Sequence, residues 1–171
     1  MQVGVFCSSC RPKLWESLYN LLSNNDVDFH LCIAGPTAPA WSLPGNVTYI
    51  QTNVKPAQCY FIAAHNVKGK YIMNVPDDLR PHPNFIDNLI NKSGKANCAY
   101  TSRYYKHNVG EKGYDRHGSF NKFYFLPKKS VTFPFPIPAG TLMDRELFFS
   151  IGMDKNFCGV WWDIDMAFEL V

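Results

Sequence analysis

The chain has 171 residues, of which 46% are apolar and 18% are charged, and its formal net charge is +3. This length and apolar content are enough for one folded domain with a buried core, and they exclude a disordered chain. The small net charge gives no sign of nucleic-acid binding, and no apolar run reaches the roughly 20 residues that a membrane span needs. Because no secretory signal follows Met1, we expect a cytoplasmic protein.

The first half of the sequence alternates short apolar runs with segments of helical periodicity. Strands are predicted at 3–6, 29–34, 47–50 and 71–73, and helices at 14–22, 60–67 and 83–90. Gly69 is predicted to stop the second helix. This β-α-β order predicts an α/β fold, with a mostly parallel central sheet flanked by helices on both faces.

The second half is less regular. Strands are predicted at 98–101 and 120–126, with a polar loop at 102–118 between them and a proline-rich run at 133–138. Asp144 is predicted to cap a short helix, and a last helix is predicted after Asp163. Residues 100–129 hold seven of the 17 basic residues and two of the 14 acidic ones. This excess of positive charge would suit an anionic or carbohydrate ligand, or it belongs to an ordinary solvated loop.

The first candidate site follows the first and fourth predicted strands. In parallel sheets, ligands bind beyond the carboxyl ends of the strands, where the strand order reverses. Cys7, Ser8, Ser9 and Arg11 follow the first strand, and Asp77-Asp78 follows the fourth. Two adjacent carboxylates repel each other unless a cation joins them, and Mg²⁺ or Mn²⁺ prefers such oxygen ligands. The alternative is a solvated turn in which one aspartate caps the next helix.

The second candidate site is the acidic and aromatic segment near the end of the chain. Asp163 and Asp165 lie at a predicted helix start, where the helix dipole favours anions. Trp161 and Trp162 beside them would form an apolar wall for a sugar, or they are buried tryptophans next to a helix cap. His82 is close enough in sequence to Asp78 to line the same site, although a histidine on a surface loop is the simpler interpretation.

The third candidate is the pair Cys7 and Cys10, which lies between a strand and a helix. Cys-x-x-Cys redox motifs occupy this position, because the helix N-terminus stabilises a thiolate. A thiol-disulfide oxidoreductase is therefore one alternative function. A non-catalytic module that binds carbohydrate or nucleotide through its aromatic side chains is another. A sugar nucleotidyltransferase would carry a glycine-rich basic loop after the first strand, and the segment 8–10 has no glycine.

Three segments together resemble the GT-A fold nucleotide-sugar glycosyltransferases, above all the inverting family 2. They are the opening strand and turn at 3–12, the segment 68–83 with its Asp77-Asp78 pair, and the block 140–152 followed by 162–165. The chain departs from the family at three places. Ala34-Gly35-Pro36 follows the second strand where relatives have an aspartate, and Val75 occupies the first acidic position of the DxD-type motif. Trp162 stands where relatives have a glutamate before the base.

The resemblance implies one GT-A domain over residues 1–171. A nucleotide-sugar-binding half would span 1–95, and an acceptor-binding half with a small antiparallel addition would span 96–171. The chain is short for this family, which fits either a compact member, such as a virus-encoded one, or one domain of a longer multi-domain protein. The implied partners are a nucleotide-sugar donor, above all a UDP-sugar, and a glycan or other hydroxyl acceptor.

The resemblance also implies a role for each candidate residue. Asp77 and Asp78 would hold Mn²⁺ or Mg²⁺ on the diphosphate, with Asp78 as the direct ligand and Asp77 near the ribose. Cys7, Ser8, Ser9 and Arg11 would line the donor. Asp163 would be the general base for inverting transfer, and Asp165 is the second choice. Trp161, Trp162 and His82 would contact the sugar or the acceptor.

Overall fold

The computed structural model describes residues 1–93, 99–100, 105–106, 115–116 and 139–151. Six strands of this part form one sheet in the order β3-β2-β1-β4-β8-β5. They are β1 (Val3–Ser8), β2 (Phe29–Gly35), β3 (Val47–Gln51), β4 (Tyr71–Asn74), β5 (Ala99–Tyr100) and β8 (Leu142–Asp144). The helices are α1 (Trp15–Leu22) after the 3₁₀ turn η1 (Pro12–Leu14), α2 (Pro56–Asn66), α3 (Phe85–Lys92) and α5 (Arg145–Ile151).

The sheet is parallel from β3 to β4 and antiparallel at β8. In the register, Phe6 of β1 lies opposite Cys32 of β2 and Asn74 of β4, so these strands end at the same edge. The chain first moves outward from β1 to β2 and β3, and α2 then carries it back across the sheet to β4. The strand order therefore reverses between β1 and β4. The predicted α/β fold with a mostly parallel sheet is confirmed.

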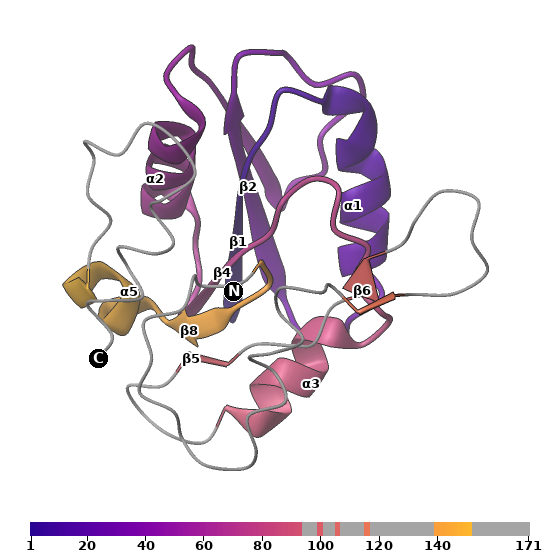
Figure 1. Ribbon diagram of the computed structural model, residues 1–171, viewed down its shortest axis with the longest axis vertical. Coiled ribbons are helices and arrows are strands. Elements are labelled where there is room, and N and C mark those ends of the chain that lie inside the picture. Colours follow the sequence, from indigo (N-terminus) through magenta and orange to yellow (C-terminus); the bar gives the residue numbers. More distant parts are fainter. Residues whose placement is uncertain (94–98, 101–104, 107–114, 117–138, 152–171) are drawn as a thin grey trace.

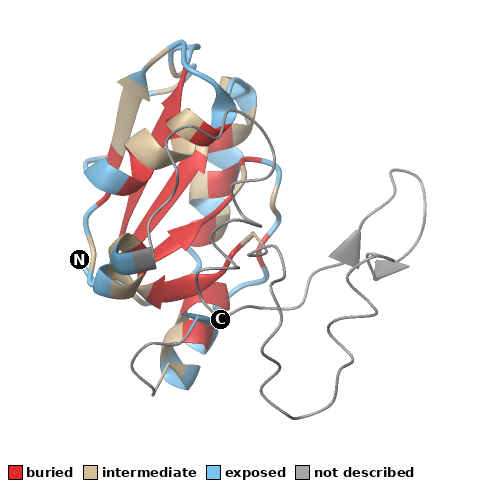
Figure 2. Ribbon diagram, turned by 60° about the vertical axis from the view of Figure 1, so that its left-hand side comes forward, coloured by how far each residue is buried: buried red, intermediate tan, exposed pale blue. Residues whose placement is uncertain are grey.

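The central strands are continuous apolar runs because both of their faces are covered. Every residue of β2 is buried, and in β1 only Ser8 is partly exposed. Figure 1 shows α1 and α3 on one side of the sheet and α2 and α5 on the other. One core cluster joins the sheet to Trp15, Leu18 and Ile86 of α1 and α3, and a second joins it to α2 and α5. Figure 2 shows these buried strands between the two helical layers.

The helix α2 differs from its prediction at both ends. It begins at Pro56 rather than at residue 60, because proline suits the first helical turn. It ends at Asn66, and Val67 is already extended, with φ −72° and ψ 148°. Gly69 is thus not the helix stop. A Cβ on Gly69 would lie 2.8 Å from the carbonyl oxygen of Tyr71, so glycine is needed here for the close passage of the chain across β1.

The second half adds the antiparallel part of the sheet. β8 pairs with β4 and β5, and Asp144 Oδ1 accepts the N–H of Glu146 at 2.9 Å, which confirms Asp144 as the cap of α5. The predicted loop at 102–118 contains a short antiparallel pair, β6 (Tyr105–Lys106) with β7 (Asp115–Arg116). The predicted strand at 120–126, the proline-rich run and the helix after Asp163 lie outside the described residues.

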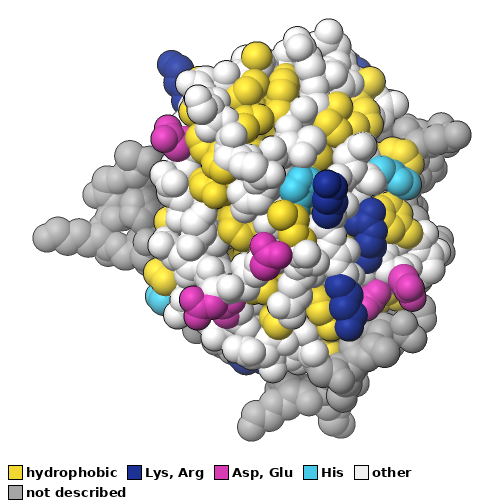
Figure 3. All heavy atoms as spheres, turned by 180° about the vertical axis from the view of Figure 1, so that it is seen from behind, with side chains coloured by type: hydrophobic (Ala, Val, Ile, Leu, Met, Phe, Trp, Pro, Cys, Tyr) yellow, Lys and Arg dark blue, Asp and Glu magenta, His cyan; other side chains and the backbone are white. Residues whose placement is uncertain are grey.

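Figure 3 shows one face of the molecule, seen from behind. Lys and Arg side chains lie near one another at the middle right of this face, with acidic side chains beside them. In the described part of the chain, no helix has the length and apolar character that crossing a membrane requires.

Candidate functional site

Two aspartates lie at the edge of the sheet where β1 and β4 end together. Val75 N–H donates to Phe6 O at 3.0 Å and extends the pairing of the two strands, and Leu79 N–H donates to Pro76 O at 3.1 Å and closes a turn. This turn sends its two carboxylates in different directions. The Asp77 side chain is 2% exposed, whereas that of Asp78 is 57% exposed.

Both oxygens of the buried Asp77 carboxylate accept hydrogen bonds from residues that follow β1. Arg11 donates to both of its oxygens, from Nε to Oδ2 at 3.0 Å and from Nη2 to Oδ1. Ser9 Oγ also donates to Oδ2, at 2.5 Å. A buried charge is tolerated only when it is paired and hydrogen-bonded, and these three bonds meet that condition.

The Ser9 hydroxyl is the centre of this network. Besides donating to Asp77, its oxygen accepts the indole N–H of Trp15 at 2.6 Å and the backbone N–H of Arg11 at 3.0 Å. A hydroxyl has one donor and two acceptor positions, so Ser9 Oγ is saturated. Trp15 is completely buried at the start of α1. The network thereby ties the turn after β4 to the first helix.

Arg11 also reaches the exposed carboxylate. Its Nη2 donates to Asp78 Oδ2 at 3.0 Å, and the Arg11 side chain is 50% exposed. Its hydrogen bonds to Asp77 and Asp78 raise the pKa of Arg11 above the ordinary value, so the guanidinium stays charged. Within the described part of the chain, Arg11 Nη1 has no hydrogen-bond partner. Among the described residues, the site therefore presents a guanidinium nitrogen without a hydrogen bond, Nη1, and the exposed carboxylate of Asp78 beside it.

The structure speaks against a redox pair at Cys7 and Cys10. Both thiols are free, and Cys7 is buried whereas Cys10 is exposed. Burial, followed by the charges of Asp77 and Asp78, raises the pKa of Cys7 well above its ordinary value. A reactive cysteine needs a stabilised thiolate, and here the thiolate is disfavoured. The oxidoreductase alternative therefore lacks its nucleophile.

Ser8 and Cys7 occupy different sides of β1. Cys7 belongs to the core on the α1 side, so its side chain is shielded from the site surface. Ser8 is half-buried, and its hydroxyl lies near Cys59 of α2. Burial raises the pKa of Cys59, and the hydrogen bond with Ser8 partly opposes this rise. Of the residues predicted after the first strand, Ser9 and Arg11 are the ones that contact the aspartates.

Two site residues were not predicted from the sequence. Trp15 was not singled out, and Tyr60 was recognised only as part of an apolar helical stripe. Burial, followed by the charges of Cys7, Asp77 and Asp78, raises the pKa of Tyr60 well above its ordinary value. Its ring packs edge-on against Phe6 at a centroid distance of 6.1 Å. Trp15 contacts Ser9 from the helix that follows β1, whereas Tyr60 lies in α2, which carries the chain back across the sheet.

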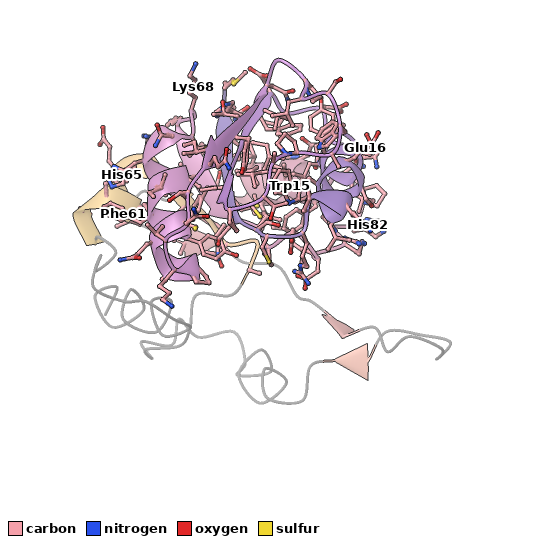
Figure 4. The ribbon with its side chains drawn as sticks, turned by 90° about the horizontal axis from the view of Figure 1, so that it is seen from above. Trp15, Glu16, Phe61, His65, Lys68 and His82 are labelled. Carbon is pink, nitrogen blue, oxygen red and sulfur yellow. The ribbon has the colours of Figure 1, made fainter. Side chains whose placement is uncertain are left out.

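The remaining candidates have different outcomes. His82 is exposed, and its Nδ1 lies 2.9 Å from Pro83 O. Figure 4 places it on the same side of the molecule as Trp15 and Glu16, opposite Phe61 and His65. Trp161, Trp162, Asp163 and Asp165 lie outside the described residues.

The second half of the chain reaches the same edge of the sheet. Gly140 N–H donates to Asn74 O at 2.6 Å, directly before the turn that holds Asp77. Tyr100, the last residue of β5, lies opposite Leu142, the first residue of β8. Among the described residues, no three His, Cys, Asp or Glu side chains gather into a metal site.

Comparisons with known proteins yield structural matches alone. No family model and no curated protein matches the sequence. Residues 1–349 of Staphylococcus aureus TarS match with a TM-score of 0.67 and 12% identity, over 99% of this chain and 55% of that one. The same TarS segment in complex with UDP matches with a TM-score of 0.60 and 13% identity, over 98% and 55%. The bifunctional IspDF from Campylobacter jejuni matches with a TM-score of 0.57 and 12% identity, over 98% and 47%.

The chain thus spans about half the length of the structures it matches. At such low identity the likeness concerns the arrangement of strands and helices. That arrangement includes the parallel strands, the antiparallel β8 and the reversal of strand order at which Asp77 and Asp78 lie. The chain has the Rossmann-like GT-A fold, which it shares with TarS.

Proposed function

We propose that this chain is a glycosyltransferase that moves a hexose-type sugar from a UDP-sugar to an acceptor hydroxyl. The observation that carries this proposal is the Asp77-Asp78 turn, held by Arg11 and Ser9 where the strand order reverses in a GT-A fold. Ligands of open α/β sheets bind at this reversal. The UDP complex of TarS, which has the same fold, supports a uridine diphosphate donor.

The two aspartates would have separate roles. Both oxygens of Asp77 accept hydrogen bonds from Arg11 or Ser9, and the side chain is 2% exposed, so this carboxylate would mainly position the site. Asp78 is half-exposed and has one bond to Arg11, so its oxygens are available. Mg²⁺ is usually bound by one or two carboxylates together with substrate phosphates and water, and Asp78 fits such a site. When bound, Mn²⁺ or Mg²⁺ would neutralise charge on the diphosphate.

Arg11 would bind the diphosphate directly. Its guanidinium is held in place by the bidentate contact with Asp77, and Nη1 retains its donors. A planar, permanently charged guanidinium suits phosphate oxygens, and its fixed position lowers the entropy lost on binding. Ser9 would contribute by fixing Asp77, which in turn fixes Arg11.

Apart from His82, the residues on the acceptor side of the proposal lie outside the described part of the chain. Asp163 would remove the proton from the acceptor hydroxyl as the hydroxyl oxygen attacks the anomeric carbon. The bond from that carbon to the diphosphate oxygen would break, so that UDP leaves and the configuration is inverted. Asp165 is the second choice for this base. Trp161, Trp162 and His82 would contact the sugar or the acceptor.

Calorimetric titration with UDP, in the presence and absence of Mn²⁺, tests the donor site. We expect the wild type to bind UDP in a Mn²⁺-dependent manner and Asp78→Asn to bind it at least about tenfold more weakly, because a ligand to the bridging ion is lost. Asp26→Asn is the matched control, since Asp26 is an exposed aspartate in the loop that precedes β2. If the wild type fails to bind UDP, or if Asp78→Asn binds it as tightly as Asp26→Asn, the proposal is wrong.

Release of UDP from a panel of UDP-sugars tests the reaction itself. We expect Asp163→Asn to keep the wild-type affinity for UDP and to lose transfer to an acceptor. A wild type that binds UDP but releases none from any UDP-sugar, with water or a glycan as acceptor, would instead identify the non-catalytic binding module.

A further inference from the structure

One guanidinium is shared by two carboxylates that differ in exposure. Arg11 binds the buried Asp77 through two of its nitrogens, and it binds the exposed Asp78 through Nη2 alone. A bidentate contact with a buried carboxylate is strong, whereas a single contact with an exposed one is weak. Arg11 is therefore anchored on Asp77, and its bond to Asp78 can open without moving the side chain from its place.

The weak contact lies on the carboxylate that the proposed function assigns to a metal ion. Arg11 Nη2 lies 3.0 Å from Asp78 Oδ2, a hydrogen-bonding distance. A divalent cation at Asp78 must share this carboxylate with the guanidinium, and it must bind beside a permanent positive charge that repels it. The negative charge of Asp77 offsets part of the positive charge of Arg11, but the Asp77 oxygens already accept hydrogen bonds from Arg11 and Ser9. In the free protein, the guanidinium therefore opposes cation binding.

We propose that Arg11 and the divalent cation compete for Asp78 in the free protein, and that a nucleoside diphosphate ends this competition by accepting the guanidinium N–H groups. This inference rests on the proposed function and adds to it the order of binding. Two phosphates carry enough oxygens for both the cation and Arg11, so the nucleotide is the partner that lets Asp78 and Arg11 separate. Metal and nucleotide then bind together, and Arg11 is the positioning residue that couples them.

Binding of Mn²⁺ to the full chain without nucleotide tests the competition, with free Mn²⁺ measured by electron paramagnetic resonance. Arg11→Met keeps the aliphatic stem and removes the guanidinium. We expect this variant to bind Mn²⁺ about twofold to fivefold more tightly than the wild type, the range expected for the loss of a half-exposed ion pair. Arg80→Met is the matched control, because Arg80 donates to the backbone carbonyls of Asp77 and Leu79 and to no carboxylate in the described part of the chain. We expect it to bind Mn²⁺ as the wild type does.

A second substitution keeps the test decisive if Arg11→Met does not fold. Arg11→Lys retains a charge near Asp77, but a single ammonium group lacks the fork that reaches both carboxylates. We expect it to bind Mn²⁺ more tightly than the wild type as well. We also expect UDP to increase the Mn²⁺ affinity of the wild type by a larger factor than that of either Arg11 variant.

The outcomes separate this inference from the proposed function. If the wild type binds both UDP and Mn²⁺, but folded Arg11→Lys or Arg11→Met binds Mn²⁺ no more tightly than the wild type, the competition is refuted and the proposed function stands. If the wild type binds no UDP at any Mn²⁺ concentration, the proposed function fails and the inference fails with it.

Discussion

Gly35, at the end of β2, lies directly against the backbone of Ser9. A Cβ at position 35 would lie 2.9 Å from the carbonyl carbon of Ser9 and closer still to its carbonyl oxygen. Ser9 N–H also donates to Ala34 O at 3.0 Å, which holds the segment after β1 against the end of β2. The Ser9 hydroxyl binds Asp77, which lies in the turn after β4. Because Gly35 leaves room for Ser9, the absence of a side chain at position 35 also helps to hold the Asp77 carboxylate in place.

Gly35→Ala is therefore expected to destabilise the protein by about 1–3 kcal/mol, because the new methyl group meets backbone that can move only by distorting the Ser9–Asp77 contact. Urea unfolding followed by circular dichroism measures this change. Gly45→Ala is the control, since no heavy atom lies within 4 Å of a Cβ built there. Equal stabilities of the two variants would contradict the importance of the Gly35–Ser9 contact.

The two neighbouring aspartates are expected to differ in their effect on stability. Asp77→Asn removes the charge from a carboxylate that is 2% exposed and bound to Arg11 and Ser9, so we expect a loss of about 1–3 kcal/mol. Asp78→Asn changes a half-exposed carboxylate with one contact, and we expect a change of less than about 0.5 kcal/mol. Urea unfolding midpoints of the two variants under the same conditions measure the difference. A greater loss for Asp78→Asn would show that the inward carboxylate has been wrongly assigned.

His30 is expected to make stability depend on pH. Its ring is 3% exposed, its Nδ1 accepts the N–H of Lys68 at 3.0 Å, and its Nε2 lies 3.0 Å from Thr48 Oγ1. An accepting Nδ1 carries no proton, so Nε2 carries it and donates to Thr48. Burial, followed by the nearby charge of Lys68, lowers the pKa of His30 below its ordinary value.

The sign of the effect follows from this lowered pKa. The unfolded chain takes up a proton at His30 near pH 6.5, whereas the folded protein does so at a lower pH. The stabilisation from neutral His30 is complete above about pH 6.5 and is lost as the pH falls toward the folded pKa. Unfolding midpoints from pH 8 to pH 5 should therefore fall less for His30→Gln than for the wild type. His82→Gln, a change at an exposed histidine, should keep the wild-type slope, and an equal slope for His30→Gln would contradict the prediction.

Local patterns in the sequence predicted most of the strands and helices in the first half of the fold. Continuous apolar runs and stripes of period three to four reflect which faces are buried, and a strand or helix was found at each place predicted up to residue 90. The helix α3, however, begins at Phe85, and Pro83 lies in the turn before it. The helix α3 shows what such patterns omit. Its backbone N–H groups at Ile86 and Asp87 are capped by Asn25 Oδ1, at 2.7 and 3.3 Å, from a loop about 60 residues earlier.

By itself, the sequence determined the α/β class, the succession of strands and helices in the first half and the place of the Asp77-Asp78 pair at a strand end, because these depend on residues that are near one another in the chain. Local patterns did not show which of the two aspartates is buried. The tertiary structure did so, since Arg11 is 66 residues away from Asp77 and pairs with it only where β1 and β4 lie side by side. The same packing buried Cys7, which speaks against the redox interpretation that its spacing from Cys10 had allowed. Burial and charge pairing are long-range properties, so they appear only when the strands have come together.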